Sequence, residues 1–179
     1  FSFACSFSFA CSFSFACSFL FLFSFFITIC LPFKSSSSSI LLGKIKTINY
    51  ARVNNIPFLG LCLGMQLSLI EIARNVLNYQ DANSSEFDAN TTHKIIDYLP
   101  NQYKGIKLGG TMRLGEYDCH ILKDTLAYSL YEKEEIKERH RHRYEFNNQY
   151  KKEFEEAGVV FSGINPQTNL CEIIELPSN

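Results

Sequence analysis

One cysteine between two glycines, in Gly60-Leu61-Cys62-Leu63-Gly64, has the residue type and spacing of a nucleophile at a sharp turn. An apolar run over residues 56–61 predicts a strand that ends there, and an apolar period typical of a helix starts immediately afterwards. Glycines permit strained backbone angles, and the first turn of a helix offers unpaired N–H groups and a dipole that favours a thiolate. The pattern predicts a nucleophile elbow with sulfur in place of oxygen. The alternative is a cysteine that only packs in the core.

The residues around this turn predict the elements that position it. Residues 43–54 have apolar side chains on one face and lysines and an arginine on the other, which predicts an amphipathic helix. The strand over residues 56–61 follows, and then a helix that runs to about residue 77. This order is typical of an α/β fold, for which we expect a mostly parallel open sheet with the site at the carboxyl ends of its strands.

After a polar loop at residues 78–90, the pattern predicts mainly strands. Extended segments are predicted over residues 111–122 and 136–146. A short helix is predicted over residues 151–157, ended by Gly158, and a final strand pair over residues 159–163 and 170–176. The segment GGTMRLG at residues 109–115 predicts a glycine turn that feeds the first of these strands, and we assign it no chemical role.

The run RHRHR at residues 139–143 combines cations with imidazoles. In an extended segment Arg139, Arg141 and Arg143 share one face, and His140 and His142 share the other. A basic run is compatible with nucleic-acid binding, and paired histidines are compatible with a metal site. Neither interpretation has support elsewhere, because there is no wider basic patch and the other histidines lie in no ligand pattern. We therefore expect neither a metal nor a nucleic-acid partner.

The first 39 residues differ in composition from the rest of the chain. FSFACS occupies residues 1–6, 7–12 and 13–18, and residues 1–33 contain no charged side chain. Strict alternation predicts an extended strand. The alternatives are a membrane span, a signal peptide, or sequence that is not native to the domain, and we favour the last. The predicted organisation is a low-complexity repeat with a serine-rich linker at residues 1–39 and a domain at residues 40–179.

Cysteine usage and charge set the expected compartment. Of the seven cysteines, Cys62, Cys119 and Cys171 lie outside the repeat and its apolar tail, and their wide spacing gives no disulfide framework. The formal net charge of −1 gives no reason to expect a polyanionic partner. We expect a cytoplasmic protein, with membrane anchoring through residues 1–33 as the alternative.

Several blocks of sequence are specific enough to indicate a family. They lie at residues 42–66, 70–88, 109–115 and 138–148, with a weaker block at 161–177. Together they resemble the glutamine amidotransferase domain of CTP synthases, a class I, triad-type glutaminase joined to an ATP-dependent amidoligase. The resemblance extends over residues 40–176 and implies the class I amidotransferase fold, here truncated at both ends.

The resemblance also implies roles for individual residues. Cys62 is the nucleophile that forms a γ-glutamyl thioester, and the Leu63 backbone N–H supplies half of the oxyanion hole. Glu86 binds the substrate α-amino group, and Arg143 contacts glutamine, for which a guanidinium bonded to the α-carboxylate is chemically suited. The expected glutamine-binding residues are Leu63, Gly64, Met65, Gln66, Glu86 and Arg143.

The implied function is the supply of ammonia for ATP-dependent amination of UTP to CTP in pyrimidine biosynthesis. The expected partners are L-glutamine, an amidoligase domain and, for the full-length family enzyme, a homotetramer, with ATP and Mg²⁺ as its cofactors and none in this chain. The family's Phe-His-Pro-Glu block, which completes the triad, and its Gly-Gly-Phe-Gly turn are absent from these 179 residues. We therefore expect negligible glutamine hydrolysis by this chain alone. The alternative is a catalytically inactive glutamine-binding or interaction module.

Overall fold

The computed structural model describes residues 2–6, 27–29, 38–99 and 112–177. Its strands are β1 (Ser2–Ser6), β2 (Ile27–Ile29), β3 (Phe58–Leu61), β4 (Asn83–Ser84), β5 (Lys94–Tyr98), β6 (Arg113–Ile121), β7 (Glu135–His142), β8 (Tyr144–Phe146), β9 (Val160–Ile164) and β10 (Cys171–Pro177). Its helices are α1 (Ser38–Val53), α2 (Leu63–Asn75), α3 (Leu126–Tyr131) and α4 (Lys151–Glu156), with a short 3-10 helix at Asn148–Tyr150.

The strands form two sheets. The larger has seven strands in the order β2-β3-β1-β10-β9-β6-β7, and the smaller has three in the order β4-β5-β8. Only the β2, β3 and β1 side of the larger sheet is parallel, since β1 with β10, β10 with β9, β9 with β6, and β6 with β7 all pair antiparallel. The expected α/β fold is present, but the prediction of a mostly parallel sheet is wrong. Residues 165–170, between β9 and β10, are too few for the crossover that parallel neighbours need.

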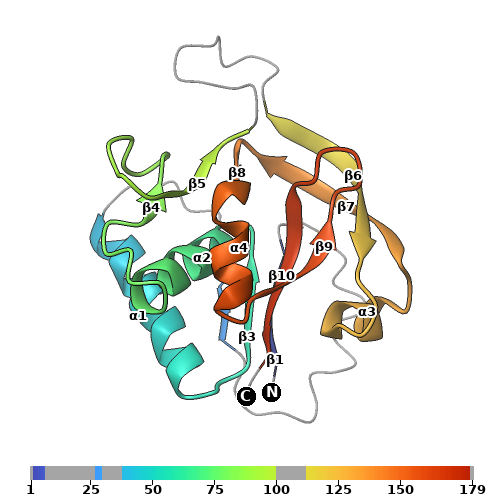
Figure 1. Ribbon diagram of the computed structural model, residues 1–179, viewed down its shortest axis with the longest axis horizontal. Helices are drawn as coiled ribbons and strands as arrows, with labels where there is room; N and C mark the ends of the chain where they lie inside the picture. Colours follow the sequence, from blue (N-terminus) through green and yellow to red (C-terminus); the bar gives the residue numbers. More distant parts are fainter. Residues whose placement is uncertain (1, 7–26, 30–37, 100–111, 178–179) are drawn as a thin grey trace.

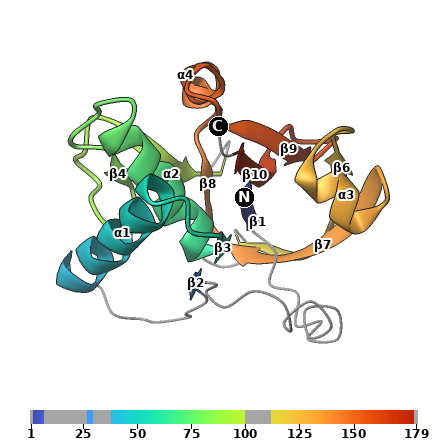
Figure 2. The same cartoon turned by 90° about the horizontal axis from the view of Figure 1, so that it is seen from below.

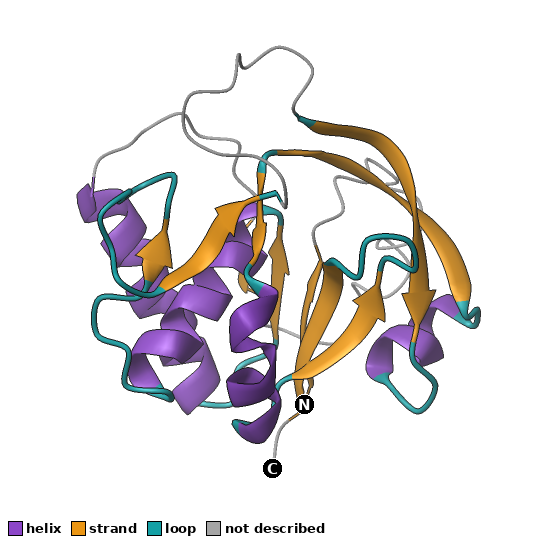
Figure 3. Cartoon of the chain, turned by 45° about the horizontal axis from the view of Figure 1, so that its top comes forward, coloured by secondary structure: helices purple, strands orange, loops and turns teal. Residues whose placement is uncertain are grey.

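Helices α1 and α2 lie at one end of the molecule and α3 at the other. Figure 2 shows α1 and α2 together at one end, and β6, β7 and α3 at the opposite end. The larger core lies between α1, α2 and the central strands and includes Ile48, Phe58, Met65, Leu69, Ile96, Phe146, Phe154 and Ile174. A smaller apolar cluster of Cys119, Ile121, Ala127 and Ile173 lies where α3 meets the sheet. Figure 3 shows α3 apart from the other helices, beside the long β6–β7 pair.

Most local predictions agree with the structure. The helices on both sides of β3 are present, although α1 begins at Ser38, before the predicted residue 43. The predicted final strand pair is the antiparallel pair β9 and β10, and α4 lies where the short helix was predicted. The predicted loop at residues 78–90 contains the two-residue strand β4.

Strand β7 has the alternation that the basic run predicts. Arg139 and Arg141 are exposed, whereas His140 and His142 are buried, and the strand ends before Arg143. Strand β7 is the last strand of the seven-stranded sheet and lies on the side of the molecule away from α1 (Figure 1).

The repeat and the apolar tail that follows it each contribute a strand to the larger sheet. Strand β1 pairs with β3 on one side and with β10 on the other, and β2 pairs with β3. The extended conformation predicted for the repeat is therefore confirmed over Ser2–Ser6. Residues 7–26 and 30–37 lie outside the described part, and the interpretation of residues 1–39 as foreign to the domain stays a prediction. None of the described helices has the length and apolar character needed to cross a membrane.

Candidate active site

Cys62 occupies the corner between β3 and α2. Its backbone has φ 52° and ψ −107°, which is an unfavourable combination for a residue with a Cβ. Its carbonyl accepts a hydrogen bond from the Gln66 N–H at 3.1 Å, so helix α2 begins directly at the cysteine. The predicted sharp strand-to-helix turn is present, and the half-buried Cys62 side chain lies at the start of a helix.

The other two cysteines of the described chain have different surroundings. Cys119 and Cys171 are buried, with exposed fractions of 0% and 3%. Burial, together with nearby carboxylates, raises the pKa of Cys119 to about 12, and burial raises the pKa of Cys171 well above its ordinary value. Both thiols therefore stay protonated and inert, which leaves Cys62 as the candidate nucleophile.

The first turn of α2 connects the corner to the smaller sheet. Leu63 is half-buried, and the Met65 side chain is completely buried in the core, so contact with a ligand from position 65 is limited to the backbone. The buried Gln66 donates from its side-chain nitrogen to the Tyr144 carbonyl at 3.2 Å. Gly64 is also buried, and its carbonyl accepts a hydrogen bond from the Ser68 hydroxyl at 2.8 Å.

Glu86 lies on a loop that is fastened to the smaller sheet. Its N–H donates to the Ser84 hydroxyl at 3.2 Å, and the N–H of the neighbouring Ser85 donates to the Ile96 carbonyl at 2.9 Å. The Ser85 hydroxyl also donates to the Asp97 carboxylate at 2.6 Å. The loop that carries Glu86 is therefore attached to β5.

Arg143 lies at the bend between β7 and β8. Its carbonyl accepts a hydrogen bond from the Leu99 N–H at 3.3 Å, and β8 pairs with β5 through Tyr98 and Tyr144. The two tyrosine rings are 4.9 Å apart. Strand β5 thus has the Glu86 loop on one side and the Arg143 bend on the other.

Glu86 and Arg143 lie within range of each other's charge. Partial burial raises the pKa of Glu86, and the positive charge of Arg143 opposes that rise. The same two charges act on Tyr144, whose pKa is raised mainly by burial and by its hydrogen bond with Tyr98. A carboxylate beside a guanidinium is complementary to a free amino acid, which presents an ammonium and a carboxylate on one carbon.

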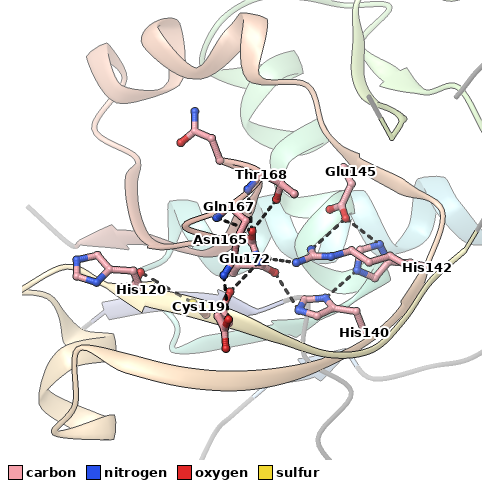
Figure 4. Close-up of polar contacts among 12 residues, drawn as sticks. Cys119, His120, His140, His142, Glu145, Asn165, Gln167, Thr168 and Glu172 are labelled. Carbon is pink, nitrogen blue, oxygen red and sulfur yellow. Dashed lines mark hydrogen bonds and ion pairs between the residues drawn. The ribbon is translucent and has the colours of Figure 1, made fainter. Parts of the chain in front are cut away.

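Beside this site lies a buried charge network, defined here as Arg113, His140, His142, Glu145 and Glu172, which sequence reasoning missed. Arg113 donates to Glu145 at 3.2 Å and also to Glu172, which lies 3.0 Å from the His140 ring. His140 and His142 are 2.9 Å apart, and His142 lies 3.4 Å from Glu145. Figure 4 shows Glu172 directed toward His140 and Glu145 toward His142. The sequence signal was a glutamate inside the apolar run CEII, since a buried carboxylate requires a partner.

The network contains one arginine cation for two glutamate side chains, and burial and the neighbouring charges together decide which of its groups are ionised. Burial and the charge of Glu172 raise the pKa of Glu145 to about 8, although Arg113 opposes the rise. Burial works to raise the pKa of Glu172 as well, but hydrogen bonds from His140 and Arg113 keep it below its ordinary value. Burial and the neighbouring His140 and Arg113 lower the pKa of His142 to about 3. At neutral pH, therefore, Glu172 is the ionised partner of Arg113, whereas Glu145 and His142 are neutral.

All four histidines of the chain lie against carboxyl groups. The distances are 2.5 Å from His93 to Asp81, 2.6 Å from His120 to Glu135, 3.0 Å from His140 to Glu172 and 3.4 Å from His142 to Glu145. Within the part of the chain that the structure describes, no group of three or more side chains is arranged to hold a metal ion. The paired histidines of β7 thus belong to a polar network that joins strands.

The fold is that of a class I glutamine amidotransferase. A family model described as glutamine amidotransferase class-I matches residues 33–179, and the chain belongs to that family. The relatives that it resembles are CTP synthases. It is 58% identical over 137 residues to the CTP synthase of Staphylococcus saprophyticus and 57% identical over 137 residues to that of Aquifex aeolicus. Each match covers 76% of this chain and 26% of the relative, so the chain spans about a quarter of their length.

A solved structure agrees with these matches. The glutaminase domain of Trypanosoma brucei CTPS with bound acivicin superposes with a TM-score of 0.70 at 33% identity, and covers 83% of this chain and 54% of that chain. The resemblance that the sequence blocks indicated is confirmed. The comparisons leave the roles of individual residues as predictions, but the structure brings Gln66, Glu86 and Arg143 to one small sheet next to the Cys62 corner.

Proposed function

We propose that this chain binds L-glutamine and supplies the nucleophile for hydrolysis of its side-chain amide. The observation that carries the proposal is the strained Cys62 corner, joined through Gln66 to the small sheet that Glu86 and Arg143 flank. Glu86 would accept hydrogen bonds from the α-ammonium of glutamine, and Arg143 would donate two to its α-carboxylate. The side-chain amide would then extend toward Cys62.

The proposed chemistry proceeds through a thioester. The Cys62 thiolate attacks the amide carbon, a C–S bond forms, and the carbonyl electron pair moves onto oxygen, where the Leu63 N–H stabilises it. The oxyanion then reforms the carbonyl while the C–N bond breaks and the nitrogen takes a proton to leave as ammonia. Water attacks the thioester, the C–S bond breaks, and glutamate and the thiolate are released. The family pattern assigns the proton transfers to the histidine of its Phe-His-Pro-Glu block.

The activity of the whole enzyme is a further part of the proposal. Because the similar proteins are CTP synthases, the ammonia would aminate UTP to CTP on an amidoligase domain that uses ATP and Mg²⁺. Among the described residues no group of three or more side chains is arranged to hold a metal ion. On the same resemblance we propose a homotetramer for the full-length enzyme and a cytoplasmic location.

The test combines ligand binding with labelling of the thiol. Acivicin, a glutamine analogue with a chlorinated ring, should form one adduct per chain as the thiolate displaces chloride, and intact-mass spectrometry with peptide mapping should locate it at Cys62. L-Glutamine should protect against labelling, and D-glutamine should not. Cys62→Ser should abolish the adduct, whereas the buried Cys119 and Cys171 provide an internal control that stays unlabelled. A chain that binds no L-glutamine and is not labelled at Cys62 would refute the proposal.

Labelling of Cys62 separates this proposal from the alternative of a non-catalytic glutamine-binding module, and a steady-state glutaminase assay tests the expectation that the chain alone is inactive. Ammonia release that Cys62→Ala abolishes would contradict the expectation that the chain alone is inactive. Saturable glutamine binding without turnover or labelling would support the binding module.

A further inference from the structure

Arg143 lies at the bend where the chain leaves one sheet and joins another. Strand β7, which ends at His142, belongs to the seven-stranded sheet, and β8, which begins at Tyr144, belongs to the three-stranded sheet. The direction of the Arg143 side chain therefore depends on the angle between these two sheets.

Arg113 bridges that bend. Its backbone pairs with His142, the residue before Arg143, at the end of the β6–β7 ladder. Its guanidinium reaches past the bend to Glu145, two residues beyond Arg143, at 3.2 Å. The same guanidinium donates to Glu172 on β10, so the bend is connected to the centre of the large sheet.

The surroundings of Arg113 make this connection stiff. Arg113, Glu145 and Glu172 are exposed by only 4%, 2% and 1%. The guanidinium carbon lies 4.3 Å from the centre of the Tyr117 ring, so one face of the group is covered. A lysine ammonium is a compact charge on a flexible stem and does not reproduce this planar fork, which reaches two carboxyl groups at once.

We propose that Arg113 is a positioning residue for glutamine recognition, which sets the direction of Arg143 toward the substrate α-carboxylate by holding β8 against β6 through Glu145. The inference rests on the proposed function, because it takes Arg143 as the carboxylate ligand. It gives a role to Arg113 of the segment GGTMRLG, whose predicted glycine turn at residues 109 and 110 lies outside the described part.

A buried arginine that only stabilises the fold is the competing explanation, and the half-buried Arg52, which pairs with a buried carboxylate, provides a control. Arg52 donates to Glu71 through two nitrogens, both at 2.8 Å, and Glu71 is completely buried. This pair joins α1 to α2, and its hydrogen bonds involve no residue of the Arg143 bend. Arg52→Lys is therefore a control for the general cost of replacing a buried-pair arginine.

The experiment measures discrimination for the α-carboxylate. Calorimetry gives the Kd of L-glutamine and of L-glutaminol, which keeps the ammonium and the amide but lacks the carboxylate. The unmodified chain should prefer L-glutamine, and Arg143→Ala should remove most of that preference. Arg113→Lys should reduce the preference by about tenfold through weaker L-glutamine binding, with L-glutaminol binding unchanged. Arg52→Lys should retain it.

Glu145 supplies a second test. Glu145→Gln keeps an oxygen that accepts from Arg113 and should retain discrimination, whereas Glu145→Met lacks it and should behave like Arg113→Lys. Full discrimination in folded Arg113→Lys or Glu145→Met would overturn the positioning role. Loss of cooperative folding in both would also overturn it, since the network would then serve the whole fold. A chain that binds neither ligand would instead refute the proposed function.

Discussion

The Cys62 corner and the Arg143 bend are held in place by different means. The corner is made by backbone: a strand ends, a helix begins, and the residue between them has a strained φ of 52°. The bend is made by buried charge, through Arg113, Glu145 and Glu172 on three separate strands. Glutamine, if it binds as proposed, connects the two.

The two features affect the stability of the fold in opposite directions. A strained residue at a functional turn costs about 1–3 kcal/mol and persists because neighbouring structure enforces it. A buried polar network stabilises only while every member has a partner, and losing one member is expensive. We therefore expect substitutions at the corner to be neutral or stabilising, and substitutions in the buried charge network to be destabilising.

The largest expected effect is that of Arg113→Met. It leaves the ionised Glu172 buried without its cation, and should lower the free energy of unfolding by about 3–5 kcal/mol. Urea unfolding followed by circular dichroism measures the change. Arg139→Met removes an exposed arginine from the neighbouring strand and should have no measurable effect. A loss below about 1 kcal/mol for Arg113→Met would remove the contrast with the corner.

The next effect is on the pH dependence of stability. Because the pKa of Glu145 is raised to about 8, the folded state keeps a proton that the unfolded state releases above the ordinary value of 4.5. Its contribution to stability is lost as pH rises from 4.5 to 8, with a slope of at most about 1.4 kcal/mol per pH unit. His142, with its pKa lowered from 6.5 to about 3, acts in the opposite direction below 6.5.

Between pH 6.5 and 8, therefore, Glu145 acts without opposition from His142. Urea unfolding at several pH values should show stability falling across this window. Glu145→Gln mimics the neutral carboxyl and should flatten that part of the profile, with stability close to that of the unmodified protein only below about pH 4.5, where the carboxyl is protonated in both the folded and the unfolded state. Equal slopes for both proteins would show that Glu145 ionises normally.

A smaller effect of opposite sign is expected at the corner. Cys62→Gly removes the Cβ at a positive φ and should raise the free energy of unfolding by about 1 kcal/mol, after the entropy cost of glycine is subtracted. Cys62→Ser keeps the Cβ and should leave stability unchanged, so the serine and glycine variants together isolate backbone strain. Glycine less stable than serine in thermal or urea unfolding would mean that the corner is unstrained.

The smallest effect is expected for exposed ion pairs. Lys152 lies 3.8 Å from Glu156, with side chains exposed by 85% and 66%. Its position before the glutamate is the less favourable order on a helix, so Lys152→Ala should change the free energy of unfolding by less than about 0.5 kcal/mol. This value sets the scale against which the buried network is compared, and a larger loss on urea unfolding would weaken that contrast.

The sequence predicts the corner well because its determinants are adjacent along the chain. A strand pattern, two glycines and a helix pattern within a few residues define the turn at Cys62, and the structure has that turn. The alternation of β7 is predicted for the same reason, since burial of His140 and exposure of Arg141 follow from strand geometry alone.

The bend and the sheet order were not predictable in this way. Arg113, Glu145 and Glu172 are far apart in sequence, and their meeting depends on β6, β8 and β10 being assembled. Strand patterns state which residues are extended but not which strands are neighbours, so the antiparallel side of the sheet was missed. Register and partner choice are set by tertiary packing, which a single sequence does not display.

Strand β7 has a consequence for how the protein behaves at high concentration. It ends the large sheet, and its outward side chains include Lys137, Arg139 and Arg141, all exposed. A second molecule pairing antiparallel along this edge, centred on Arg139, would place cation against cation, which opposes sheet extension. The screening length is about 8 Å at physiological ionic strength and shorter in concentrated salt. Added salt should therefore weaken this protection, and self-association should rise with ionic strength.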